Sequence, residues 1–292
     1  MPDVRQVVSW NGDGWQDLDA IAAALAASEP AWSPGTQRGY HAVTYGWLVG
    51  ELVRRTDGRT LGRFFRDEVA QPLGIRAAVG VPAQEQSDIA IVHPDGMDTP
   101  PLLMRRINGR MRRLMRDPST LLGKASLGDG KQSIFDDSST LVNSSAWNGA
   151  EVPSSNGVSS AHDLARLFAA VACGGELDGV RLVSPDTLER FTASQPTSQD
   201  VVFSSAMGSI MGGLMRRKLT APISLSFALN GAAGTMGPNP RAFGAGGYGG
   251  QFVLADPDRR LSIAFVRSAL LPSQRELTAL VRAVYADLDS QQ

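Results

Sequence analysis

The sequence has little cysteine and little histidine. Its single cysteine, Cys173, excludes an intrachain disulfide. It lies in an apolar helical stretch, so it is interpreted as core filler rather than as a reactive thiol. The three histidines, His41, His93 and His162, are scattered and lack metal-ligand spacing. We therefore expect neither a metal nor an organic cofactor.

The sequence also lacks an excess of charge of one sign and an apolar run long enough to cross a membrane. The formal net charge is −1, so nothing overall indicates a nucleic-acid partner. No apolar run approaches the ~18 residues that a membrane-spanning helix needs. No basic segment followed by an apolar one opens the chain, so no signal peptide is visible and a cytoplasmic location is expected.

The composition is that of an ordinary globular protein. Of the 292 residues, 42% are hydrophobic and 20% are charged, and a chain of this length can bury a sizeable core. We predict a single domain over residues 1–292. It would comprise a helical region at about 15–240 and a C-terminal sheet and helix at about 241–292.

Apolar periodicity and capping residues predict the helices. The helix at 41–55 carries the apolar repeat Tyr45, Leu48, Val49 and Leu52, and Ser160 with Asp163 forms a capping box for a later helix. The stretch 129–153 is rich in Ser and Asn and predicts a long loop. The predicted helices span 17–27, 41–55 and 61–71, with two more beginning at Ser160 and Ser184.

The last part of the chain predicts a hairpin followed by a helix. Residues 251–255 and 261–268 are partly β-branched, and Asp256-Pro257-Asp258 between them has turn chemistry. Ser273 to Glu276 forms a second capping box before an apolar stripe that should pack on this sheet. We therefore expect an α/β fold of the α+β type, an antiparallel sheet flanked by helices with a helical subdomain.

Residues 104–116 form a basic run that contains six arginines. On a helix, Ile107, Met111, Leu114 and Met115 would share one face, although Gly109 weakens the helix prediction. A solvated helix covering the active-site side is favoured over contact with a membrane surface or an acidic ligand.

Other enzyme classes lack their signatures. No Gly-x-Ser-x-Gly sequence occurs, so an α/β-hydrolase has no nucleophile here. The glycine-rich stretch 244–250 is not followed by a lysine and a helix start, so it is not a phosphate-binding loop.

Three segments of the chain carry recognisable motifs. They are Trp32-Ser33-Pro34-Gly35-Thr36 through Tyr40-His41-Ala42 and the following helix to Pro72-Leu73-Gly74-Ile75, the Asn-Gly segment 153–161, and Phe243 to Gly250 with Ala255 to Asp258. These segments resemble the serine β-lactamase-related family, which includes class C β-lactamases, DD-peptidases and family VIII-type esterases. The resemblance extends from about residue 30 to 288.

The resemblance implies a β-lactamase/transpeptidase-like fold and acyl transfer from an ester or amide to water. It places Tyr40 as the general-base candidate. Gly246, Gly247 and Tyr248 would form the strand that binds the oxyanion, and Asn156 would contact a small-molecule substrate, which the sequence does not identify. Physically, a serine hydroxyl needs a nearby base, and developing negative charge needs preorganised donors.

The chain departs from the family pattern at its most important motif. The family's nucleophile is the serine of a Ser-x-x-Lys sequence, but Leu121, Gly128 and Met215 stand three residues before the lysines, Lys124, Lys131 and Lys218. Ala42 replaces a frequent Asn, and Ala245 stands where the family has Lys or His. We expect an N-terminally truncated hydrolase with its first strands missing and no activity. The alternative is a natural pseudoenzyme that acts as a binding or scaffold protein.

If those strands are missing, Leu261 to Ser268 would form an exposed sheet edge with unpaired backbone groups. The expectation is poor solubility or pairing with another chain.

Overall fold

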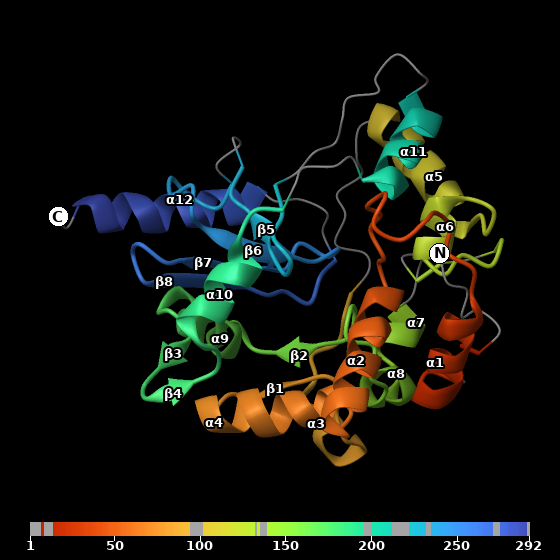
Figure 1. Cartoon of the computed structure of the whole chain (residues 1–292). Coiled ribbons are helices and arrows are strands. Elements are labelled where there is room, and N and C mark those ends of the chain that lie inside the picture. The colour runs from red at the N-terminus through yellow and green to blue at the C-terminus, as the bar shows by residue number, and fades with distance from the viewer. Residues whose placement is uncertain are drawn as a thin grey trace.

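The computed structural model describes residues 7–8, 14–93, 102–131, 133–134, 139–195, 200–211, 222–231, 235–270 and 275–290. Figure 1 shows a sheet layer on one side and a group of helices on the other. No helix in these ranges combines the length and the apolarity required to cross a bilayer.

The main sheet has four antiparallel strands in the order β5-β6-β7-β8. The predicted hairpin is confirmed as β7 and β8, with Leu254 opposite Ile263 and Asp256 opposite Leu261. β7 is buried along its whole length, as expected for an inner strand covered on both faces. The strands are β5 (Ala228–Leu229), β6 (Phe243–Gly246), β7 (Phe252–Asp256) and β8 (Leu261–Phe265).

A helix covers each face of this sheet. Helix α9 (Ala161–Ala172) packs Phe168 against Val253 and Ala255. Helix α12 (Arg275–Ser290) packs on the opposite face, where Leu277 and Val281 meet Leu254 and Ile263 among other residues. The two helices lie on either side of the strands in Figure 1. The predicted α+β architecture and the packing of the last helix on the sheet are confirmed.

Side-chain caps begin the helices around the sheet. Ser160 Oγ accepts a hydrogen bond from Asp163 N at 3.1 Å, as the predicted capping box requires. Ser184 caps α10 (Pro185–Thr192) in the same way. The predicted cap at Ser273 lies outside the described residues.

Three tryptophans hold the lower helices together. Trp15 lies 5.8 Å from Trp47 and 5.0 Å from Trp147, between ring centroids. These rings join α1 (Leu18–Ala27), α2 (Thr44–Asp57) and α8 (Ser145–Gly149) in one apolar core. The prediction of one long loop over 129–153 is wrong, because α7 (Ser139–Val142) and α8 interrupt it. Ser144 caps α8, and the buried Trp147 anchors it.

Helix α2 forms as predicted but turns a different face inward. Tyr45, Leu48 and Leu52 are exposed by 54%, 39% and 63%. Gly46 and Trp47 are buried instead. The indole Nε1 of Trp47 donates to Glu151 O at 2.8 Å, which accounts for its inward position.

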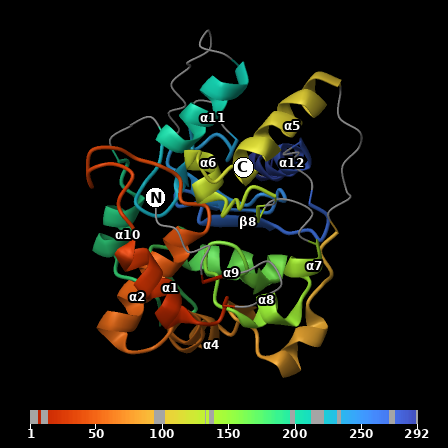
Figure 2. The ribbon, with the colours of Figure 1, turned by 90° about the vertical axis from the view of Figure 1, so that its right-hand side faces the viewer.

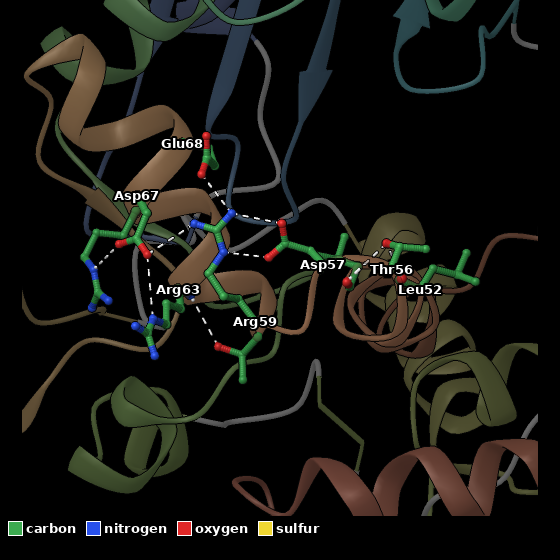
Figure 3. A network of polar contacts seen from close by, with 10 residues as sticks. Leu52, Thr56, Asp57, Arg59, Arg63, Asp67 and Glu68 are labelled. Atoms are coloured by element: carbon green, nitrogen blue, oxygen red, sulfur yellow. Dashed lines mark hydrogen bonds and ion pairs between the residues drawn. The ribbon is translucent and has the colours of Figure 1, made fainter.

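An arginine network follows α2. Figure 3 shows Arg59 between three acids: it contacts Asp57 at 2.6 Å, Glu68 at 2.8 Å and Asp67 at 3.4 Å. The predicted helix 61–71 is realised as α3 (Leu61–Phe65), a π-helical segment η1 (Arg66–Ala70) and α4 (Gln71–Leu73). The network ties the turn after α2 to the start of these segments.

A third group of helices stands away from the sheet. The basic run forms helix α5 (Leu102–Arg116) despite Gly109. Its residues Met111, Leu114 and Met115 pack against α6 (Leu121–Ala125) and α11 (Val201–Met211). Figures 1 and 2 both show α5 and α11 together at one end of the molecule. The helix is confirmed, and three residues of its predicted apolar face are packed, whereas its position over the active-site side stays a prediction. We call α5, α6 and α11 the cap.

Strand β8 stands last in the main sheet, and within the described residues it pairs only with β7. The predicted pairing of this edge with another chain stays a prediction.

Short elements complete the fold. The short elements are β1 (Ala77–Ala78) paired with β2 (Val158–Ser159), β3 (Glu176–Leu177) paired with β4 (Val180–Arg181), and the 3-10 segment η2 (Ala83–Asp88).

Candidate functional site

Tyr40 lies at the end of a structured loop that leads into α2. Gly35 adopts φ +82° in the turn, a conformation that favours glycine. Trp32 Nε1 donates to Gln37 O at 3.1 Å and closes the loop on itself. A Cβ on Gly39 would lie 2.5 Å from the Trp32 ring, so this position must stay small. The loop sequence thus fixes the backbone immediately before Tyr40.

The cap holds the other side of this loop. Val201 N donates to Arg38 O at 2.9 Å and ties α11 to the chain just before Tyr40. Asp200 caps α11 by accepting from Val202 N and Phe203 N, both at 3.0 Å. The Phe203 ring is thereby placed over the Tyr40 ring, stacked with centroids 5.2 Å apart.

The surroundings of Tyr40 keep its hydroxyl protonated. Partial burial raises the pKa of Tyr40 above its ordinary value, and the negative charge of Asp200 raises that pKa further. A tyrosine that acts as a base needs the opposite shift, which nearby cations would produce. The described residues show no such activation of Tyr40, and its predicted general-base role stays a prediction.

Phe203→Ala should lower the pKa of Tyr40 toward that of a free tyrosine, near 10, because it removes the ring that shields the phenol from water. The measurement is a pH titration of tyrosinate absorbance, with the Tyr40→Phe spectrum subtracted to isolate one residue. Phe191→Ala is the control, since this phenylalanine contacts Phe227 instead. An unchanged Tyr40 pKa in Phe203→Ala would show that the stacking does not control ionisation.

The segment around Asn156 lies against α2. Ser154 Oγ accepts from Gly46 N at 2.8 Å, which joins two of the segments that resemble the family. The Asn156 amide is buried and forms hydrogen bonds within its own loop. It accepts from Val152 N at 3.0 Å and donates to Trp147 O at 2.8 Å and Ala150 O at 2.7 Å. We interpret Asn156 as a residue that shapes this loop, and its predicted substrate contact stays a prediction.

The glycine-rich segment forms the turn between β6 and β7. Gly246 ends β6, and Gly247 N donates to Gln251 O at 2.8 Å, so this N–H is used within the turn. Gly246, Gly247 and Tyr248 are exposed. The predicted oxyanion-binding role of Tyr248 N–H stays a prediction. The turn belongs to the sheet layer in Figure 1.

Two residues that sequence reasoning missed support these segments. Phe203 lies in the Ser-rich sequence of α11, VVFSSAMGSIM, in which no motif was identified. Arg267 Nε donates to Gly249 O at 2.7 Å and places a cation beside the glycine turn. No motif marked either residue, because both contacts depend on the folded chain.

Within the described residues no metal-ligand cluster gathers, and a pocket between α1 and α2 does not include Tyr40. No group of three or more His, Cys, Asp or Glu side chains gathers in the described part of the chain as a metal site would require. A shallow apolar pocket between α1 and α2 is lined by Ile21, Trp47, Glu51 and Glu151 among others, but not by Tyr40. Glu151 there already accepts from Thr60 Oγ1 and Gly62 N, so we interpret the pocket as structural.

Comparisons with known proteins agree with the motif resemblance. A family model described as Beta-lactamase matches residues 5–286. The esterase/beta-lactamase LipL of Mycobacterium tuberculosis (strain ATCC 25618 / H37Rv) is 30% identical over 257 residues, which cover 85% of this chain. That alignment covers 52% of LipL, so the chain spans about half the length of this curated relative.

Solved structures show the same fold. A family VIII carboxylesterase superposes with a TM-score of 0.74 at 28% identity, covering 97% of this chain and 67% of that one. A penicillin-binding protein homolog from Caulobacter crescentus superposes with a TM-score of 0.71 at 30% identity, covering 93% of this chain and 64% of that one. The β-lactamase/transpeptidase-like fold predicted from the motifs is confirmed.

Proposed function

The chain belongs to the β-lactamase family, and from this premise we propose that it takes part in ester hydrolysis by acyl transfer to water. The observation that supports this most is the ordered Tyr40 loop, held by Trp32 on one side and stacked on Phe203 on the other. The likeness to a family VIII carboxylesterase and to an esterase/beta-lactamase supports an ester over other acyl substrates.

In this proposal the neutral Tyr40 phenol donates a hydrogen bond to the substrate. Donors that are already in place when negative charge develops are worth far more than donors that must reorganise. Because Phe203 and Asp200 hold Tyr40 protonated, its natural role is to bind an ester oxygen or to supply a proton to a departing alkoxide. The exposed turn Gly246 to Tyr248 is proposed as a second substrate contact.

A binding protein without turnover is the second candidate. It is favoured by one observation, the lack of Ser-x-x-Lys in the sequence. Without a serine activated by a neighbouring base, ester hydrolysis by the family's route has no nucleophile. The same Tyr40 surface would then bind esters and release them unchanged.

The test is hydrolysis of p-nitrophenyl acetate and butyrate by the purified chain. For an active enzyme we expect turnover to fall at least about tenfold in Tyr40→Phe, because a positioned proton donor typically contributes 10²–10⁴-fold. Tyr45→Phe is the matched control, since Tyr45 is similarly exposed and only five positions away. Turnover that is lost equally in both variants would rule out a specific role for Tyr40. A folded protein with no turnover would favour the binding role. Calorimetry would then measure how tightly the chain binds the ester.

A further inference from the structure

Helix α5 exposes several cationic side chains. Its side chains Arg106, Arg112 and Arg113 are exposed to solvent. The helix contains no acidic residue, so no i,i+4 partner offsets these charges within it. At 1.5 Å per residue, the positions from 106 to 113 extend over roughly 10 Å of helix. The whole chain carries a net charge of only −1, so positive charge is concentrated here.

Three arginines of α5 are not paired with an acid in the described residues. No ion pair or hydrogen bond involves the side chain of Arg106, Arg112 or Arg113 there. By contrast, Arg59 and Arg54 each contact two or more acids. Arg106, Arg112 and Arg113 therefore present charge that no described acid neutralises.

The apolar face of α5 is already in use. Met111, Leu114 and Met115 pack on α6 and α11, so the helix is fixed and cannot insert its apolar side into another environment. Arg106, Arg112 and Arg113 are exposed to solvent along the helix. An extended anionic surface can contact several such arginines at once, whereas a small free anion cannot.

The neighbouring helix favours a lipid surface over a nucleic acid. Helix α11 contains no charged residue and lies beside α5 in both Figures 1 and 2. Phe203 on α11 is 38% exposed, and Tyr40 stacked on it is 48% exposed. Basic groups beside exposed aromatic rings suit the headgroup region of a membrane, where rings with a polar edge are favoured.

We propose that the cap is a peripheral docking surface for anionic phospholipid bilayers, with Arg106, Arg112 and Arg113 as its electrostatic contacts. Docking through the cap brings the Tyr40 loop to the membrane surface, where esters with long acyl chains concentrate. The inference does not depend on turnover, because membrane binding is measured separately from hydrolysis.

The experiment is vesicle co-sedimentation of the intact chain. We expect binding to mixed phosphatidylcholine–phosphatidylglycerol vesicles, little binding to pure phosphatidylcholine vesicles, and loss of binding in high salt, which screens charge. Each basic residue near an anionic surface contributes roughly fivefold in affinity, so the triple variant R106Q/R112Q/R113Q should bind about a hundredfold more weakly.

The matched control is R55Q/R63Q/R76Q. It removes the same charge from side chains that are 73%, 66% and 82% exposed, on segments at the other end of the molecule from α5 in Figure 1. A lysine version of the α5 triple should retain most binding, and unchanged thermal melting would show that the variants are folded. Equal loss in both glutamine triples, equal binding to neutral vesicles, or binding to duplex DNA without binding to vesicles would each overturn the proposal.

Discussion

Asp256→Ala is expected to lower the free energy of unfolding by about 3–5 kcal/mol, because it leaves several buried donors without an acceptor. Asp256 is fully buried. Its Oδ2 accepts from the Tyr285 hydroxyl at 2.6 Å, and its Oδ1 accepts from Asn239 Nδ2 at 2.5 Å. The backbone N–H groups of Asp258 and Arg259 also donate to Oδ1, both at 3.1 Å. One carboxylate thus joins the β7–β8 turn to α12 and to the chain before β6.

The measurement is urea unfolding followed by circular dichroism. Asp258→Ala is the control, because its side chain is 47% exposed and pairs with Arg241 at the surface. That variant should change stability by less than about 1 kcal/mol. Tyr285→Phe should fall between the two, since it removes a single donor. An Asp256→Ala protein as stable as Asp258→Ala would show that the buried network contributes nothing net.

Tyr285 also gives the network a dependence on pH. Burial raises the pKa of Tyr285, and its hydrogen bond to Asp256 raises that pKa further. A tyrosine whose pKa is raised on folding contributes stability that is fully present below its unfolded pKa, near 10. That contribution is lost as the pH rises above about 10, and the wild type should therefore lose more stability there than Tyr285→Phe.

The turn at Asp256 illustrates what the sequence could and could not predict. Asp256-Pro257-Asp258 between two β-branched runs predicts a hairpin, because that signal lies within a few neighbouring residues. The contact with Tyr285 is 29 positions away, and no local pattern marks it. The capping box at Ser160 and the helix start at Ser184 were predictable for the same local reason.

The face of α2 shows how periodicity can mislead. Tyr45, Leu48 and Leu52 recur at helical spacing and predict the helix, but they are exposed. The buried face is set by Trp47, whose partners Trp15 and Glu151 come from elsewhere in the chain. Apolar spacing therefore gave the element, while tertiary contacts decided its orientation.

The candidate site also combines a residue that the sequence could single out with residues whose contacts it could not predict. Tyr40 could be singled out because its flanking residues resemble the family in order and spacing. Phe203 could not, since nothing in a Ser-rich stretch indicates that its ring will stack on Tyr40. The same limit applies to Asn156, whose three hydrogen bonds within its own loop no motif indicated.

Opposite effects are expected from the same substitution at two glycines of α2. In Gly46→Ala the new Cβ would lie 2.5 Å from Ser154 N and 2.8 Å from Ser154 Oγ. One of these atoms is backbone, so the loop must move, and overpacking of this kind costs about 1–3 kcal/mol. In Gly50→Ala the nearest atom is Leu61 Cβ at 3.7 Å, an ordinary contact. Alanine favours the helix, so this variant should gain roughly 0.5–1 kcal/mol.

Thermal and urea unfolding of the two variants separate overpacking from helix propensity, since helix propensity alone would stabilise both. The displaced loop in Gly46→Ala also carries Glu151, whose carbonyl accepts from the Trp47 indole. Tryptophan fluorescence should therefore change in that variant and stay constant in Gly50→Ala. Equal stabilisation of both variants would mean that the loop carrying Ser154 moves aside without lowering the free energy of unfolding. The Tyr40 segment would then be held to the body of the protein by the Trp47 core and the cap, and not by the contact at Gly46.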